Sequence, residues 1–294
     1  MANLKEIRTR ISSVTSTRQI TSAMKMVAAA KLKKAQEAVV HLRPYVHKMQ
    51  DIMLHVSLSS DVDDDNVYAE DRDYEKVLIV AITSNRGLCG AFNSNIIKEC
   101  MNLAQNKYGD LFARGKVRFM TIGKKGFDNL SRRNIPVDEQ NYDIYENLTY
   151  ENVVPIAQEL IDSFVSGRYD CIDIVYNEFK NAATQKIISH QFLPLLPEED
   201  HNHKQRSASN YIFEPSKQEM VKELIPMLLK LFLYQALLDS VASEYGARMT
   251  SMQQATDNAT SLIQDLTLQY NKARQASITN EIVEIVGGAE ALNG

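Results

Sequence analysis

The stretch Ser84–Asn93, SNRGLCGAFN, follows a continuous apolar run, and its residue types come closest to those of a nucleotide site. A dinucleotide-binding domain cradles phosphate in a glycine-rich turn between its first strand and the next helix. Gly87 and Gly90 are three residues apart, but no third glycine completes the GxGxxG pattern. We therefore interpret the stretch as a tight turn that needs glycine backbone angles, and we expect the domain to be a scaffold rather than an enzyme.

Two Gly-Lys pairs could in principle belong to a phosphate-binding P-loop. That loop needs another glycine five residues before the pair, and the sequence has Asp110 before Gly115 and Arg118 before Gly123. Neither pair fits the pattern. We expect the chain to hold no cofactor of its own.

Histidines and cysteines offer little metal or nucleophile chemistry. His201 and His203 could supply half of a metal site, but no Cys and no third His lies near them, so we interpret them as loop residues. Cys89 has no convincing catalytic base after it and suits a small residue in a tight turn. The three cysteines show no CxxC spacing, which argues against a disulfide framework or zinc site and favours a reducing compartment.

Charge is segregated along the chain, although the net charge is only -4. Residues 1–56 carry ten Lys or Arg and three Asp or Glu, whereas residues 61–75 carry eight acids and one Arg. The N-terminus has no apolar signal core. The best candidate for a membrane span, Ile225–Leu238, has fourteen residues interrupted by Lys230, which is shorter than the about twenty that a span needs.

The last seventy or so residues, from about Ser216 to Val286, predict one long helix. Apolar residues recur in alternating steps of four and three, which keeps one stripe facing a partner helix. Such a helix would be ~100 Å long, too long for a domain of this size to enclose, so we expect foreign protein to surround part of it. The members of this stripe are Leu224, Leu228, Leu231, Gln235, Leu238, Ala242, Tyr245, Met249, Met252, Thr256, Ala259, Ile263, Leu266, Tyr270 and Ala273.

Residues 3–57 repeat the heptad pattern. Most members of their stripe are apolar, from Leu4 to Val56, but three consecutive members are Arg18, Thr21 and Lys25. A block of three suggests that the two helices part there or meet something polar. Because the second helix is longer, an antiparallel pair would leave its tip unpaired, exposing Ile278, Ile282, Val283, Ile285 and Val286.

The middle of the chain alternates strands and helices. Strands are predicted at residues 76–83, 117–122, 169–176 and 184–192, with helices at 95–107 and 151–166 and a short helix after GKKG. This order predicts an α/β fold with a mostly parallel, Rossmann-like sheet, added to a long antiparallel coiled coil. The expected domains are 1–58 (helix), 59–74 (acidic linker), 75–195 (α/β domain), 196–215 (loop) and 216–294 (helix).

Five sequence blocks resemble one known family, the gamma subunits of F-type ATP synthases, which form the central rotor shaft. They span both helices and the central domain in the expected order. They are RxRIxSVxxTxxITxAMxMVAxxK at 8–31, TSNRGLCGAFN at 83–93, YIFEP at 211–215, SEYGARMTSMQQATDNA at 243–259 and YNKARQASITNEIVEIVGGA at 270–289.

The resemblance implies a non-catalytic rotor inside a ring of three alpha and three beta subunits, turned by proton flow through a membrane ring. It places the protein peripherally at the cytoplasmic face of the bacterial inner membrane. Tyr211, Phe213 and Glu214 should contact the membrane-embedded c-ring and the epsilon subunit. The residues implied to contact the alpha/beta ring are Arg18, Met24, Lys25, Arg248, Gln275, Thr279 and Glu281.

Two other classes of function stay open from the residues alone. The first is a nucleotide-dependent α/β enzyme that dimerises through its coiled coil, which saturable ATP binding by the isolated chain would favour. The second is a tethering coiled coil, which a stable long homodimer would support. The acidic residues 61–73 and the loop 201–210 lie outside the family motifs, so their roles stay open.

Overall fold

The computed structural model describes residues 4–57, 67–68, 73–182, 184–195 and 217–293. The chain divides into two compact units. One, the helical unit, comprises Met1–Ala29 and Arg248–Gly294, and the other, the α/β unit, comprises Ala30–Ala247. The two terminal helices, α1 (Leu4–Ser57) and α6 (Lys217–Asn293), contribute residues to both units. The predicted domain boundaries, with a central domain at 75–195, stay a prediction.

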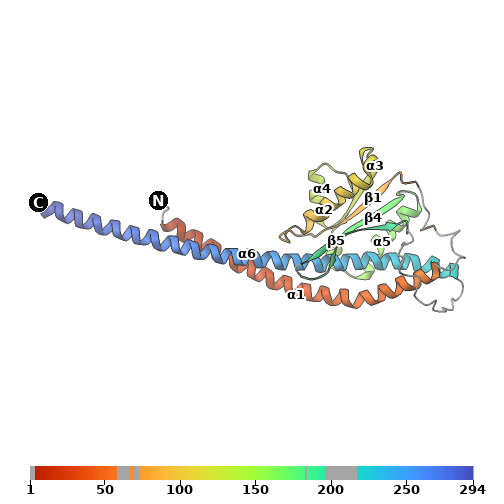
Figure 1. Cartoon of the computed structure of the whole chain (residues 1–294), viewed down its shortest axis with the longest axis horizontal. Helices are drawn as coiled ribbons and strands as arrows, with labels where there is room; N and C mark the ends of the chain where they lie inside the picture. Colours follow the sequence, from red (N-terminus) through yellow and green to blue (C-terminus); the bar gives the residue numbers. More distant parts are fainter. Residues whose placement is uncertain (1–3, 58–66, 69–72, 183, 196–216, 294) are drawn as a thin grey trace. The chain divides into compact units, whose positions relative to one another are not determined.

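A five-stranded sheet in the order β3-β2-β1-β4-β5 forms the centre of the α/β unit (Figure 1). The strands are β1 (Val77–Ile82), β2 (Val117–Ile122), β3 (Val137–Asn141), β4 (Cys171–Phe179) and β5 (Gln185–Leu193). The first four pair in parallel and β5 pairs antiparallel to β4. The prediction of a mostly parallel sheet with terminal helices is confirmed.

Both faces of the sheet are covered, which explains why β1 is apolar throughout. Leu78, Val80 and Ile82 point to one face and pack against α5 (Tyr150–Val165) and α6. Val77, Ile79 and Ala81 point to the other, against α2 (Phe92–Asn102), a π-turn (Leu103–Lys107) and α4 (Lys124–Arg132). Two shorter helical segments, α3 (Gly109–Ala113) and η3 (Asp143–Tyr145), complete the unit.

One strand of the sheet has no counterpart among the predicted elements. The sequence of β3, VDEQN, contains no apolar run, because the strand lies at the sheet edge. The other predicted elements are present with shifted ends. The helix expected at 95–107 begins at Phe92 and ends in a π-turn, and the strands expected at 169–176 and 184–192 are Cys171–Phe179 and Gln185–Leu193.

Helix α6 has two apolar faces in the α/β unit, although heptad spacing showed only one. Leu231, Leu238 and Ala242 lie on the predicted stripe and are buried. Residues off the stripe, including Ile225 and Leu233, are fully buried in the core between the sheet and α5. A helix that packs on two sides must be apolar on two sides.

This double packing also explains the high hydropathy of α6. By length and composition alone, the segment Lys222–Ala289 could cross a membrane, contrary to the expectation that every apolar run is too short. Half of its most apolar 18-residue stretch is buried inside the protein. The buried side chains named above contact the sheet and α5, so the fold itself accounts for that apolar character.

Within each unit, α1 and α6 run antiparallel. In the helical unit, Thr21 contacts Thr256 and Lys25 contacts Gln253, so residue numbers fall along α6 as they rise along α1. In the α/β unit, the Lys31 ammonium lies 5.5 Å from the Tyr245 ring centroid. Residues of the predicted stripes are buried in the helical unit, including Ile7, Ala28, Met252, Ala259 and Leu266.

Candidate functional site

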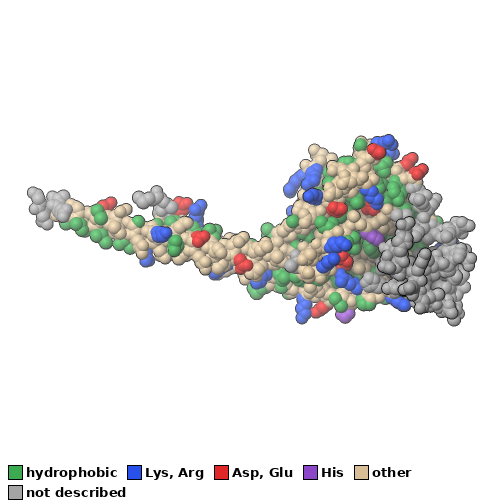
Figure 2. Space-filling view, viewed as in Figure 1, with side chains coloured by type: hydrophobic (Ala, Val, Ile, Leu, Met, Phe, Trp, Pro, Cys, Tyr) green, Lys and Arg blue, Asp and Glu red, His purple; other side chains and the backbone are tan. Residues whose placement is uncertain are grey.

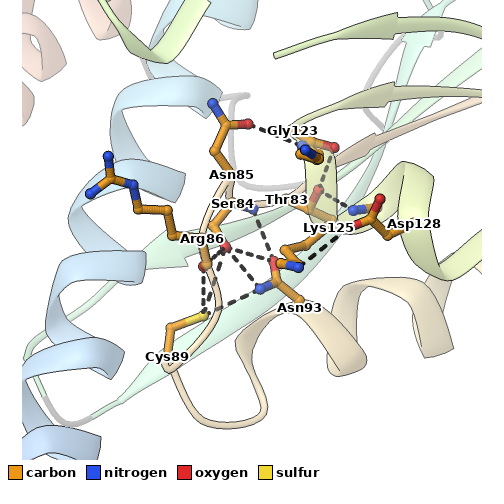
Figure 3. A network of polar contacts seen from close by, with 11 residues as sticks. Thr83, Ser84, Asn85, Arg86, Cys89, Asn93, Gly123, Lys125 and Asp128 are labelled. Carbon is orange, nitrogen blue, oxygen red and sulfur yellow. Dashed lines mark hydrogen bonds and ion pairs between the residues drawn. The ribbon is translucent and has the colours of Figure 1, made fainter. Parts of the chain in front are cut away.

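Several polar groups of the turn after β1 form hydrogen bonds within the turn (Figure 3). The Ser84 backbone N–H donates to Asn93 Oδ1 at 2.9 Å, and the Ser84 hydroxyl donates to the Arg86 carbonyl at 2.7 Å. The Asn93 amide in turn donates to Cys89 Sγ at 3.2 Å. These internal contacts use donors that a phosphate-binding turn would direct at its ligand. The geometry therefore supports a structural turn.

Backbone angles in this turn differ from the expectation in one respect. Gly90 has a positive φ of 61°, as a glycine turn requires, but the second residue with positive φ is Leu88, at 64°. Gly87 is not in this region. Leu88 is 64% exposed, so its left-handed backbone places an apolar side chain in solvent.

The second Gly-Lys pair lies in the turn between β2 and α4, which packs closely against the end of β1. Gly123 has a φ of 112°, and a Cβ there would lie 2.1 Å from the Thr83 carbonyl oxygen. The Gly126 N–H donates to Thr83 Oγ1 at 2.9 Å, and the Lys125 N–H donates to the Ser84 carbonyl at 3.0 Å (Figure 3). The start of α4 is thereby tied to the end of β1.

The cysteines are buried and poorly suited to nucleophilic chemistry. Cys89, Cys100 and Cys171 are free thiols with at most 1% exposure. Burial raises the pKa of the Cys171 thiol to about 11 and also raises the pKa of Cys100, which disfavours the reactive thiolates. Among the described residues, no group of three or more His, Cys, Asp or Glu side chains could hold a metal. His201 and His203 lie outside the described residues.

The polar break in the helix pair is a set of direct contacts, and the helices do not part there. The Thr21 and Thr256 hydroxyl oxygens are 2.8 Å apart, and Thr21 is only 9% exposed. The Lys25 ammonium donates to Gln253 Oε1 at 2.7 Å. Thr256 belongs to the predicted stripe of α6, but Gln253 does not, so the sequence could not supply this partner. Side chains of opposite helices thus satisfy the polar groups of the break.

The residues implied to contact a ring differ in exposure. Arg248 is 8% exposed, Arg18, Met24 and Lys25 are half-buried, and Gln275, Thr279 and Glu281 are exposed. Tyr211, Phe213 and Glu214 lie outside the described residues. The structure brings Lys25 to α6 through Gln253, while Thr279 and Glu281 make hydrogen bonds within α6 to Gln275 and Ser277.

The C-terminal part of α6 exposes apolar side chains in the helical unit. Figure 2 shows hydrophobic side chains along this helix with few charged ones between them. Those expected at the tip are all 47–71% exposed: Ile278, Ile282, Val283, Ile285 and Val286. Exposed apolar side chains gathered in this way are typical of surfaces that associate with other proteins.

The fold and contacts above define the class as an α/β protein with a long antiparallel pair of terminal helices. A model of the ATP synthase family (ATP-synt) matches residues 3–292. The ATP synthase gamma chains of Flavobacterium psychrophilum and Flavobacterium johnsoniae are each 56% identical over 294 residues, covering all of both chains. The chain therefore belongs to the ATP synthase gamma chain family.

Solved structures show the same fold. A chain from the central stalk and c-ring of Tetrahymena thermophila mitochondrial ATP synthase matches with a TM-score of 0.59 and 27% identity, covering 80% of this chain and 99% of that one. A chain from the Euglena gracilis mitochondrial ATP synthase matches with a TM-score of 0.68 over 98% of this chain and 94% of that one, at 23% identity.

Family membership settles the class of function. The chain is a non-catalytic rotor subunit, the central stalk of an F-type ATP synthase. The expected resemblance and the expected absence of an enzyme activity of its own are confirmed by these relatives. The α/β enzyme and the tethering coiled coil, both left open by the residues, are not supported.

Proposed function

We propose that the chain couples proton flow to ATP synthesis or hydrolysis by turning within a ring of three alpha and three beta subunits. The observation that carries the proposal is the exposed apolar tip of α6. Its side chains would be removed from water only if other protein subunits surrounded the tip. Rotation of an asymmetric stalk would give the ring's sites unequal contacts, and differential contacts are what shifts a conformational equilibrium.

The ring would be contacted at two places on the helical unit. The first is the polar break with its neighbours, where the half-buried Arg18, Met24 and Lys25 offer cationic and soft apolar groups. The family motif adds Arg248 to this set, although it is only 8% exposed in the chain alone. The second is the tip, where Gln275, Thr279 and Glu281 offer exposed polar groups between the apolar ones. Acidic loops of the beta subunits would complement Lys25 and Arg18, because opposite charges meet favourably across an interface.

A separate contact with the c-ring and the epsilon subunit would be made by Tyr211, Phe213 and Glu214. This assignment rests on the YIFEP block. The relative from Tetrahymena comes from a central stalk and c-ring assembly, which supports a c-ring partner here. The relatives include bacterial ATP synthase gamma chains, and the proposed position is peripheral, at the cytoplasmic face of the inner membrane.

Assembly is the direct test of these partners. The affinity-tagged chain, co-expressed with the alpha, beta and epsilon subunits of its own organism, should co-purify with them in a fixed stoichiometry. Replacing Ile282 and Val286 by Asp should reduce recovery of alpha and beta subunits, because a charge would enter an apolar sleeve. The control replaces the exposed residues Glu284 and Asn280 by Ser, and its recovery of alpha and beta subunits is compared with that of the Asp variant. Recovery of no alpha or beta chains with the unaltered protein would overturn the proposal.

A second test separates coupling from assembly. Met24→Lys adds a charge beside Lys25, and we expect it to lower ATP-driven proton pumping more than ATP hydrolysis in inverted membrane vesicles. Met227→Lys makes the same chemical change at a 38% exposed position of the α/β unit and should leave the ratio unchanged. An equal loss of both activities in Met24→Lys would contradict this role of the polar break.

A further inference from the structure

Arg43, on α1 in the α/β unit, joins three elements through one guanidinium. Its Nη2 donates to the Phe179 carbonyl at the end of β4 at 3.0 Å and to Asp239 Oδ1 of α6 at 3.1 Å. The Asp239 side chain is 1% exposed, whereas the Arg43 side chain is 37% exposed. An arginine therefore enters from the surface to neutralise a carboxylate inside the fold.

The carboxylate needs this partner. Burial raises the pKa of Asp239, and the nearby Arg43 charge opposes that shift. A buried carboxylate is tolerated only when it is paired and hydrogen-bonded. Arg43 has a planar fork of donors, so it can serve the carboxylate and the carbonyl together, which a lysine ammonium does less well.

The end of β4 also lies close to α6 at two further points. The Ser243 hydroxyl donates to the Asn177 carbonyl at 3.1 Å. A Cβ on Gly246 would lie 3.0 Å from the carbonyl oxygen of Ala182, in the turn between β4 and β5. Helix α6 is thus held against this hairpin by a hydrogen bond and a close backbone approach, in addition to its apolar core contacts.

Helix α1 is attached differently. Its buried residues in this unit, such as Leu32, Val39 and Val46, lie on the heptad stripe that faces a partner helix. The core cluster on the adjacent sheet face draws its side chains from the strands, α5 and α6. Apolar contacts between helices fix their separation but are non-directional, so they resist sliding and twisting less than directed polar contacts do.

We propose that Arg43 is a positioning residue for torque transmission, which holds α1 in register with α6 and β4 when the rotor works under load. This inference rests on the proposed rotary coupling. Torque that reaches the α/β unit would pass into both helices. Arg43 is the contact that ties α1 to β4 as well as to α6, and it adds to the contact of Lys31 with the Tyr245 ring. The ion pair and the carbonyl contact together oppose movement of α1 along these two elements.

The test uses the complete ATP synthase in inverted membrane vesicles, with ATP-driven proton pumping and ATP hydrolysis measured on the same samples. For Arg43→Met we expect the ratio of pumping to hydrolysis to fall by roughly threefold, a size typical of a residue on a coupling network. Arg43→Lys should give an intermediate ratio. A ratio equal to that of the unaltered complex for Arg43→Met would overturn the proposal.

Loss of stability is separated from loss of coupling by a double variant. Arg43→Met with Asp239→Leu replaces the buried pair by apolar groups, which often restores stability. It does not restore the contact with the Phe179 carbonyl. We expect thermal stability of the complex to recover while the ratio stays low. Recovery of both would show a merely structural role and overturn the proposal.

Arg118→Met provides the matched control, because it also leaves a carboxylate, Asp138, without its arginine in the same sheet. Neither Arg118 nor Asp138 belongs to α1 or α6, so the pumping ratio should stay unchanged. If the ratio of pumping to hydrolysis fell equally for Arg118→Met and Arg43→Met, general destabilisation of the sheet would explain both losses. That result would overturn the inference. Absence of coupled pumping in the unaltered complex would instead contradict the proposed function itself.

Discussion

The helical unit and the α/β unit differ in how much of their large apolar side chains they bury. In the α/β unit, β1 is completely buried between two layers of helices, and large side chains such as Phe119 and Phe164 have no exposure. In the helical unit, large apolar side chains of α6 remain about half exposed or more, among them Ile282 and Val283. The first unit encloses its own core, while the second leaves large apolar side chains in contact with solvent.

The comparison predicts which property of the protein a substitution in each unit should change. A buried side chain contributes to the stability of the chain alone, because its transfer from water is completed on folding. An exposed apolar side chain contributes only when a partner covers it. Stability of the isolated chain and activity of the complex should therefore respond to different residues.

The largest expected effect comes from the core of the α/β unit. Phe119→Ala should lower the free energy of unfolding by about 3–5 kcal/mol, since it removes a fully buried ring and leaves a cavity. Val283→Ala, at a 64% exposed site, should change it by under about 0.5 kcal/mol. Urea unfolding followed by circular dichroism measures both. Similar losses for the two variants would break the comparison.

A backbone substitution should come next. Gly123→Ala should cost about 2–4 kcal/mol, because its φ of 112° is unfavourable for alanine and its Cβ would meet the Thr83 carbonyl. Gly115→Ala, with a φ of 70° and open space around it, should cost only about 1–2 kcal/mol. Thermal unfolding of the two variants compares them. Equal losses would mean that the close approach to Thr83 is relieved by movement of β1.

A smaller effect is expected in the helical unit. Thr21→Val removes the hydroxyl contact with Thr256 and should cost about 1 kcal/mol. Thr17→Val, whose exposed hydroxyl bonds only to the Ser13 carbonyl of its own helix, should cost under about 0.5 kcal/mol. A double-mutant cycle with Thr256→Val isolates the interaction. A coupling energy of zero would show that the break contributes nothing to helix pairing.

The smallest effect is a pH dependence in the α/β unit. Hydrogen bonds from Arg118 hold the pKa of Asp138 below its usual range, and Tyr169 donates to the same carboxylate at 2.7 Å. A lowered folded pKa gives stability that is present above the unfolded pKa of about 3.9 and is lost as pH falls through the folded pKa.

Asp138→Asn should therefore be less stable than the unaltered chain at neutral pH, and the difference should narrow as the pH falls below about 4. Thermal unfolding between pH 2 and pH 7 gives both curves. A difference that stays constant across this range would refute the contribution of the ionised Asp138.

Much of the candidate site could be predicted because it is local in sequence. The glycines Gly87 and Gly90 correctly indicated a tight turn after the first strand, and the block Arg18, Thr21 and Lys25 correctly marked an unusual part of the helix pair. The partner Gln253 could not be predicted, since it lies off the heptad stripe. Leu88 could not be either, because its positive φ depends on how the turn closes.

The sequence by itself determined the long helices and the buried strands, because heptad spacing and continuous apolar runs are properties of neighbouring residues. The tertiary structure alone decided the polar edge strand β3, the antiparallel direction of β5 and the second apolar face of α6. It also decided the contact of Arg43 with Asp239 and Phe179. These features join residues far apart in the chain, and their energies arise only when the elements meet.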